Sequence, residues 1–209
     1  RFLSALMQVV RPFFGWSGLL LWLCLAGLGL ALGGLYWSEL THDVFAQLST
    51  PYSLVALWLL FPVIKLLHEL GHGLMTKAFG GEVHELGVML LVLTPVPYCE
   101  ASAAWAFRDK WQRVLVGAAG MMVEVALATL ALVIWINAEP GLVRVLAYNT
   151  ILLAGASTLL FNLNPLLRFD GYFMLMDWLE IPNLRARAMA YLRYFCERYL
   201  FGARKVSRP

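Results

Sequence analysis

Charged residues are scarce in this sequence: Asp, Glu, Lys and Arg together make up 14% of its 209 residues. A soluble domain usually carries about 25% charged residues, so the composition argues against a water-soluble globular protein. The net charge of +3 is small, and we expect no nucleic-acid partner. Hydrophobic residues make up 61% of the chain and gather in long blocks, which is typical of proteins that cross a membrane several times.

Cysteine is also scarce, because Cys24, Cys99 and Cys196 are the only three and form no CxxC pair. This spacing predicts neither a cysteine zinc site nor a disulfide framework. We expect all three to fill apolar or interfacial positions. The first residue is Arg1, and the first ten residues lack the layout of a signal peptide, so we expect a processed chain or an excised domain.

Four apolar segments are long enough to cross a bilayer, which takes about 20 helical residues. The sequence therefore predicts an all-α polytopic membrane protein with about four transmembrane helices, and the lipid bilayer is an expected partner. The segments run roughly over residues 16–37, 52–79, 114–136 and 142–163.

A further apolar stretch, residues 86–93, is too short to span a bilayer as a helix. It is flanked by Gly80-Gly81 and by Pro95-Val96-Pro97, and its valines favour a strand. We expect a short membrane-embedded strand or hairpin here. Non-helical backbone survives at that depth only when it packs against protein or lines a wet cavity.

The C-terminal region is predicted to form a short helix that ends at Pro182, followed by an amphipathic helix that Asn183 could cap. Basic amphipathic helices of this kind lie on anionic membrane surfaces. The chain is expected to divide into a cytoplasmic or interfacial segment (1–15), a membrane core (16–181) and a basic interfacial helix with its tail (182–209). The apolar stripe of that last helix comprises Leu184, Ala188, Leu192, Phe195 and Tyr199.

Basic residues are distributed unevenly among the predicted loops. The first loop carries Glu39 and Asp43 but no Lys or Arg, whereas seven of the chain's 16 basic residues lie beyond Asn183. Lysines and arginines collect on the cytoplasmic side of a membrane. We therefore expect both termini, and the loop between the second and third segments, in the cytoplasm. The C-terminal ends of the second and fourth segments then lie on the same side.

The second segment contains the sequence "HELGH", residues 68–72, inside an otherwise apolar run. His68 and His72 stand at positions i and i+4, so a helix places both imidazoles on one face, where they could bind one zinc ion. Glu69 could reach a metal-bound water without being a ligand. Ionisable groups inside a membrane are costly and usually functional. The alternative is a hydrogen-bonded polar cluster at a helix interface.

A catalytic zinc site usually has a third protein ligand and leaves one position for water. Asp170 follows the fourth segment and therefore arrives on the same side as "HELGH", whereas His42 would lie on the wrong side. Pro165 and Gly171 would let the chain turn there. The alternatives are that Asp170 caps a helix, or that His84 is the third ligand.

"HELGH" followed by "NPLLRFDG" (residues 164–171) resembles the site-2 protease family of intramembrane zinc metalloproteases, whose signatures are HExxH and NPxPxxDG. Asn164, Pro165, Asp170 and Gly171 match the second signature, while Leu167 replaces its second proline. The resemblance covers roughly residues 52–179 and is closer to a bacterial branch of peptide zinc metalloproteases. It implies an enzyme of the bacterial cytoplasmic membrane, with a soluble arm or export partner not present in this chain.

The family has a glycine-rich motif in the span between its two ligand helices, where this chain has "GAAGMMVE" (residues 117–124). Glu124 stands where many members have asparagine, and a glutamate near the middle of a span is costly. It could line the active site or belong to a buried structural pair. Asn164 could hydrogen-bond a substrate or a neighbouring backbone group.

Together these features predict a zinc metalloendopeptidase that cleaves membrane-embedded or membrane-associated peptides. Zn²⁺ held by His68, His72 and Asp170 would lower the pKa of a bound water, and Glu69 would be the general base. The edge of residues 83–93 could pair with an extended substrate by strand addition. Two alternatives stay open, which are a non-proteolytic component of a peptide maturation or export system and a metal transporter.

Overall fold

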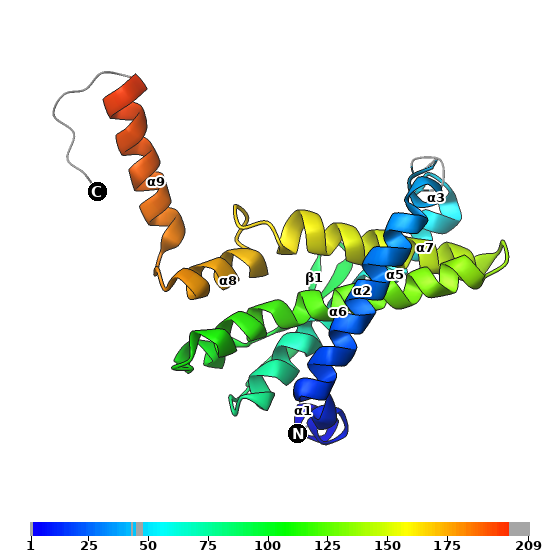
Figure 1. The fold of residues 1–209 in the computed structure, drawn as a ribbon, viewed down its shortest axis with the longest axis horizontal. Coiled ribbons are helices and arrows are strands. Elements are labelled where there is room, and N and C mark those ends of the chain that lie inside the picture. Colours follow the sequence, from blue (N-terminus) through cyan, green and yellow to red (C-terminus); the bar gives the residue numbers. More distant parts are fainter. Residues whose placement is uncertain (1, 43, 45–47, 201–209) are drawn as a thin grey trace.

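The computed structural model describes residues 2–42, 44 and 48–200 (Figure 1). Asp43 of the first loop and the basic tail after residue 200 lie outside the described residues. The described chain is mostly helical and contains one two-stranded sheet. In chain order its elements are α1 (Phe2–Val10), η1 (Arg11–Phe14), α2 (Trp16–Leu35), α3 (Trp37–Thr41), α5 (Pro51–Ala78), β1 (Leu86–Leu91), β2 (Thr94–Cys99), η2 (Ser102–Ala106), α6 (Lys110–Asn137), α7 (Leu142–Ala156), η3 (Ser157–Asn162), α8 (Asp170–Leu179), α9 (Leu184–Phe195) and η4 (Cys196–Leu200).

Four helices are long and apolar enough to cross a membrane, which confirms the predicted number. They are α2, α5, α6 and the continuous pair of α7 and η3, and η3 has the wider π-helical form. Side-chain caps fix where two of them begin. Thr50 accepts a hydrogen bond from the Ser53 N–H at the start of α5, and Asp109 accepts one from the Trp111 N–H at the start of α6.

Helix α6 lies at the centre of the bundle and packs against α2, α5, α7 and α8. Its close approach to α5 depends on small residues, because a Cβ added at Gly71 would lie 2.9 Å from the carbonyl oxygen of Ala119. At the far end of α6, Trp135 packs against Tyr148 of α7. The Tyr148 hydroxyl donates to the carbonyl of Leu40 at 2.9 Å, which ties α7 to α3.

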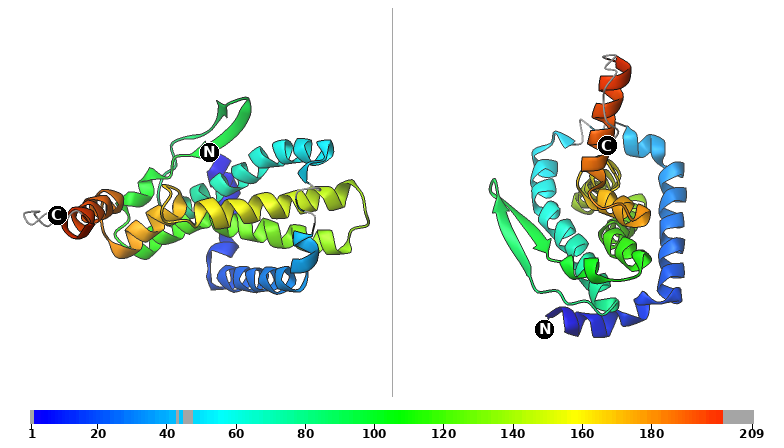
Figure 2. Two further views of the ribbon diagram at one scale, coloured as in Figure 1. Left: turned by 90° about the horizontal axis from the view of Figure 1, so that it is seen from above. Right: turned by 90° about the vertical axis from the view of Figure 1, so that its left-hand side faces the viewer.

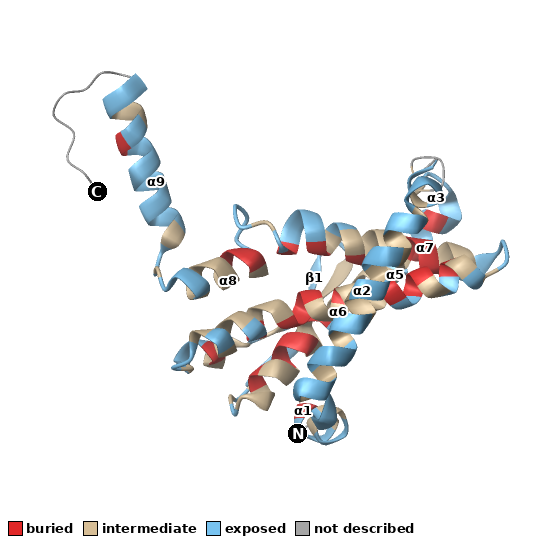
Figure 3. Cartoon of the chain, viewed as in Figure 1, coloured by how far each residue is buried: buried red, intermediate tan, exposed pale blue. Residues whose placement is uncertain are grey.

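Helix α2 covers one side of the bundle and buries none of its residues (Figure 3). It is fixed to α6 by the Trp22 Nε1–H, which donates to the carbonyl of Met122 at 2.9 Å. Long apolar helices with exposed outer faces need an apolar environment, as a lipid bilayer would supply. Membrane insertion itself stays a prediction.

The segment after α5 forms an antiparallel hairpin, with β1 paired to β2 from Leu86↔Cys99 to Leu91↔Thr94. Its two-residue turn, Val92 and Leu93, has positive φ at both positions, as a type I′ hairpin turn requires. Strand β2 packs against α5. The hairpin and α2 lie on opposite sides of the α6–α7 pair (Figure 2).

The hairpin was predicted, but the prolines expected to flank it lie inside its second strand. Pro95 and Pro97 pair with Leu90 and Val88. Residues two positions apart direct their backbone N–H groups to the same edge of a strand, so two prolines at this spacing leave the alternate residues free to bond β1. Whether the hairpin enters the membrane stays a prediction.

The C-terminal helices were predicted, except for the capping role of Asn183. Its side chain makes no capping hydrogen bond, and its backbone is left-handed, with φ 55°. The carbonyl of Asn183 instead accepts from the N–H of Arg187 at 3.2 Å. Helix α9 runs across the direction of α6 and α7 (Figure 1), and of its residues only Tyr194 is buried. Contact with a membrane surface and the boundaries of the three predicted parts stay predictions.

Candidate metal centre

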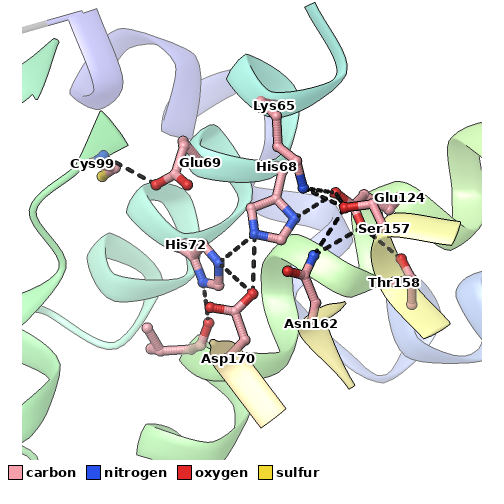
Figure 4. Close-up of polar contacts among 11 residues, drawn as sticks. Lys65, His68, Glu69, His72, Cys99, Glu124, Ser157, Thr158, Asn162 and Asp170 are labelled. Atoms are coloured by element: carbon pink, nitrogen blue, oxygen red, sulfur yellow. Dashed lines mark hydrogen bonds and ion pairs between the residues drawn. The ribbon is translucent and has the colours of Figure 1, made fainter. Parts of the chain in front are cut away.

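Three predicted ligands come together where the C-terminal half of α5 meets the first residue of α8 (Figure 4). His68 and His72 lie one turn apart on α5 and are almost fully buried, at 4% and 8% exposure. Asp170 begins α8, half-buried, after the chain has turned back at the end of η3. The predicted arrival of Asp170 beside "HELGH" is therefore confirmed. Asp170 is the first helical residue and Phe169 holds the cap position, so the capping alternative is wrong.

The facing atoms of the three side chains form a small triangle. Nε2 of His68 lies 3.1 Å from Nε2 of His72. Oδ2 of Asp170 lies 3.0 Å from Nε2 of His68 and 3.5 Å from Nε2 of His72. A tetrahedral zinc ion with bonds of about 2.0–2.1 Å separates neighbouring ligand atoms by roughly 3.3 Å, so the triangle has the size that one ion needs.

Oδ2 of Asp170 is buried, and within the described residues no hydrogen-bond donor is aligned with it. Buried polar atoms are nearly always paired, so an unpaired carboxylate oxygen facing two imidazoles fits a metal ligand. Burial opposes ionisation of Asp170, but the neighbouring His68 and His72 rings outweigh it. When these rings are protonated, they hold the pKa of this carboxyl well below its usual range.

The second nitrogen of each imidazole faces an oxygen acceptor. Nδ1 of His72 lies 2.7 Å from the carbonyl oxygen of Val116. Nδ1 of His68 lies 3.1 Å from Oε1 of Glu124, close enough for an ion pair but not aligned as a hydrogen bond. An acceptor on Nδ1 favours the tautomer with its proton there, which leaves the lone pair on Nε2 for a metal. The carbonyl of Val116 therefore prepares His72 to bind through Nε2, and the negative charge of Glu124 favours the same tautomer of His68.

Gly120 of α6 makes room for both rings. A Cβ added at this position would lie 2.5 Å from Nε2 of His68 and from Nε2 of His72. That distance is far inside ordinary contact, so any side chain here would displace the imidazoles.

Glu69 lies beside the three ligands and lines the same cleft as His72 and Asp170, with a volume of about 380 Å³. Its Oε2 accepts a hydrogen bond from the backbone N–H of Cys99 at 3.0 Å, so β2 fixes the direction of this carboxylate. Trp105 and Phe173 also line the cleft. Glu69 is thus placed where a group bound in the cleft could meet its carboxylate.

Cys99 also lines this cleft but is poorly suited to nucleophilic or ligand chemistry. Burial raises the pKa of its thiol to about 11, and the carboxylates of Glu69 and Glu100 add to the shift. The thiol therefore stays protonated near neutral pH, whereas both chemistries need the thiolate.

The sequence left two roles open for Glu124, which were lining the site and forming a buried structural pair. The contacts of Glu124 include both a candidate ligand and a cation. It is fully buried, and its carboxylate lies against His68 and accepts from Lys65 Nζ at 2.7 Å. Ser157, Thr158 and Asn162 also donate to it. Sequence reasoning missed these four partners. A lysine three positions before His68 in an apolar segment was the available signal for Lys65.

Asn164 and the other histidines lie apart from the three ligands. The Asn164 side chain accepts from the Leu166 N–H at 3.0 Å and donates to the Leu160 carbonyl at 3.5 Å, so it stabilises the turn after η3. Its suggested contact with substrate stays a prediction. His84 is exposed at the start of the hairpin segment and is not part of the three-residue group. His42 lines a separate cavity of about 480 Å³ between α3 and the start of α7.

The described residues contain one group of three His, Cys, Asp or Glu side chains that could hold a metal ion, and it is His68, His72 and Asp170. Its donor set of two imidazoles and one carboxylate suits zinc. Comparisons of the chain with protein-family models, with curated proteins and with solved structures find no match.

Proposed function

We propose that this chain is an intramembrane zinc metallopeptidase of the site-2 protease type. The observation that carries the proposal is the triangle of His68 Nε2, His72 Nε2 and Asp170 Oδ2, with edges of 3.0 to 3.5 Å and with Glu69 on the wall of the adjoining cleft. Three protein ligands beside an open cleft are typical of catalytic rather than structural zinc sites.

Zinc bound here would supply Lewis acidity, which polarises a peptide carbonyl and makes a water acidic enough to react near neutral pH. Glu69 would accept the proton of the attacking water and pass it to the leaving amine. The hydrogen bond from Cys99 holds one oxygen of this carboxylate and leaves the other available for the proton.

The cleft favours an extended peptide as substrate. It is lined by α5, β2, η2, α6 and α8, so the end of a strand lies beside the candidate ligands. Strand β1 pairs with β2 alone in this two-stranded sheet, and its other edge could pair with an unwound substrate. A helical peptide must be unwound before its carbonyl can be attacked, because helical hydrogen bonds cover the backbone.

The distribution of basic residues supports a cytoplasmic position of the proposed centre. The buried Leu3 of α1 lies against α5 at Gly73, one position after His72, so the N-terminal region lies beside the ligands. By the distribution of basic loop residues, this end faces the cytoplasm. The proposal therefore places the protein in a bacterial cytoplasmic membrane with both termini inside.

The test is cleavage of a membrane-embedded reporter peptide by the full chain reconstituted in liposomes with zinc. Glu69→Gln should keep its zinc and lose about 10²–10⁴-fold in cleavage rate, as expected for removal of a general base. Glu100→Gln is the matched control, because Glu100 lines the same cleft but is not assigned a role, and it should retain cleavage. Equal turnover by Glu69→Gln would remove Glu69 from the mechanism.

Two results would favour the alternatives. A protein that binds zinc but cleaves no peptide in any lipid would support a non-proteolytic role in peptide maturation or export. Zinc flux into the liposomes that depends on His68 would support a transporter.

A further inference from the structure

We propose that Glu124 is a positioning residue for the metal centre, which orients the His68 ring and anchors the chain segment that delivers Asp170, while Lys65 balances its charge. This inference rests on the proposed zinc site and deepens it, because it assigns a role to a buried carboxylate on the opposite side of the His68 ring from Asp170 (Figure 4).

The carboxylate of Glu124 is fully buried, and both of its oxygens have polar neighbours. Oε1 lies 3.1 Å from Nδ1 of His68 and accepts from Lys65 Nζ at 2.7 Å. Oε2 accepts from the Thr158 hydroxyl at 2.6 Å and from Asn162 Nδ2 at 3.1 Å. The contacts therefore join α5, α6 and η3 at one point.

A structural ion pair alone would not need this arrangement. Burying a carboxylate costs several kcal/mol unless it is paired and hydrogen-bonded, and Lys65 with the η3 donors already meets that need. Oε1 is nevertheless shared between Lys65 and the ligand His68. A carboxylate behind a metal-binding imidazole fixes its tautomer and its ring orientation.

The same carboxylate anchors the segment that leads to Asp170. Thr158 and Asn162 both lie in η3, whose π-helical form is uncommon and often marks functional sites. The end of η3 touches the start of α8, because a Cβ added at Gly171 would lie 2.5 Å from the carbonyl oxygen of Asn162. Glu124 thus acts on His68 through a carboxylate 3.1 Å from its Nδ1, and on Asp170 through η3.

Charge balance gives Lys65 its part. Its Nζ also donates to the hydroxyl of Ser157, so the ammonium stays beside Glu124. If the carboxylate were neutralised, the lysine would remain as an uncompensated positive charge near a dication. Loss of the Glu124 carboxylate should therefore weaken zinc binding for two reasons. The His68 ring loses its neighbouring carboxylate, and the charge of Lys65 is no longer balanced.

The test measures the zinc affinity of the purified full chain in detergent by competition with a chelator, together with the melting temperature of the zinc-free protein. Glu124→Gln should bind zinc about 10- to 100-fold more weakly, the loss typical for removal of a partner behind a ligand. Lys65→Met combined with Glu124→Gln should regain part of that loss but not all of it, because the imidazole stays unsupported.

Thr158→Val tests the η3 anchor while keeping both charges, and it serves if Glu124→Gln fails to fold. It removes the hydrogen bond from Thr158 to Oε2 of Glu124. It should weaken zinc binding, but by less than Glu124→Gln does. The matched control is Thr129→Val, since Thr129 is a buried threonine of α6 that donates only within its own helix, to the Val125 carbonyl. This control should keep the parent affinity.

Different results overturn different claims. If His68→Ala combined with His72→Ala binds zinc as tightly as the parent chain, the proposed metal centre itself is wrong. A second outcome is that the parent chain binds zinc at these ligands while Thr158→Val, and Glu124→Gln if it folds, bind zinc as tightly as the parent. In that case the positioning role is wrong. Full recovery of affinity in the Lys65→Met double variant would reduce Glu124 to a counter-ion for the lysine.

Discussion

Oδ2 of Asp170 lies 3.0 Å from Nε2 of His68, although α6, α7 and η3 separate the helices of the two residues in sequence. The contact requires the C-terminal half of α5 and the end of η3 to lie on the same side of the bundle, as they do (Figure 1). With His72 they form a ligand set of the size and chemistry that zinc takes.

The role of Asp170 as a metal ligand can be tested by comparing it with Asp177, a second aspartate of α8. Asp170→Ala should bind zinc far more weakly than the parent chain, because two imidazoles alone leave the ion without a charged protein ligand. Asp177→Ala is the control, since Asp177 lines the same cleft but pairs with Arg113 at 2.9 Å. Elemental analysis after dialysis against a chelator measures the zinc content of both variants. An unchanged zinc content in Asp170→Ala would place the third ligand elsewhere, with His84 the next candidate.

The close approach of α6 to the imidazoles predicts an unusual effect of a single methyl group. Gly120→Ala should lose zinc affinity, since its Cβ would fall 2.5 Å from both Nε2 atoms, and overpacking of this kind costs about 1–3 kcal/mol. Gly155→Ala on α7 meets nothing within 4 Å and should change neither zinc affinity nor melting temperature by much. Equal zinc binding by the two variants would mean that the rings do not lie where α6 requires a glycine.

The orientation of the bundle can be tested with single cysteines, after Cys24, Cys99 and Cys196 are replaced by serine. Glu139→Cys and Arg108→Cys introduce a thiol at exposed positions at opposite ends of α6. A membrane-impermeant maleimide added to intact cells should label the first and not the second, because the basic loop before α6 is expected in the cytoplasm. The reverse pattern would invert the topology, and labelling of both would exclude a membrane crossing by α6.

Cys99 offers a pH-dependent test of the charges in the cleft. Only the thiolate reacts with alkylating reagents, so a thiol with a pKa of about 11 should be labelled slowly at pH 8 and faster as the pH rises toward that value. Burial is the larger cause, and the carboxylates of Glu69 and Glu100 add to it. Glu69→Gln should therefore lower the pKa and speed labelling at a fixed pH. A labelling midpoint near the ordinary value of about 8.5 would contradict this environment.

The number of spans and the three candidate metal ligands could be predicted from the sequence because their signals do not depend on how the helices are packed. Helical spacing alone puts His68 and His72 on one face, and the distribution of basic residues brings Asp170 to the same side. The partners of Glu124 could not be obtained in this way. Lys65 is on another helix, and its contact depends on how α5 and α6 are rotated against each other, which hydropathy does not encode.

Local conformation was also harder to predict than the order of elements. Pro95 and Pro97 were expected to end a strand, yet they lie within β2 because their spacing spares one edge of it. Asn183 stands at the right position for a cap, but its left-handed backbone leaves the side chain without a capping bond. In both cases the residue types were informative and the backbone angles decided the outcome.

The central claim is that two imidazoles and one carboxylate of this chain hold one zinc ion, and zinc X-ray absorption of the purified, zinc-loaded protein tests it most directly. The predicted result is one ion per chain, with a shell of two histidine nitrogens near 2.0–2.1 Å and oxygen in the remaining positions. A shell containing sulfur near 2.3 Å, or one with fewer than two histidines, would contradict it.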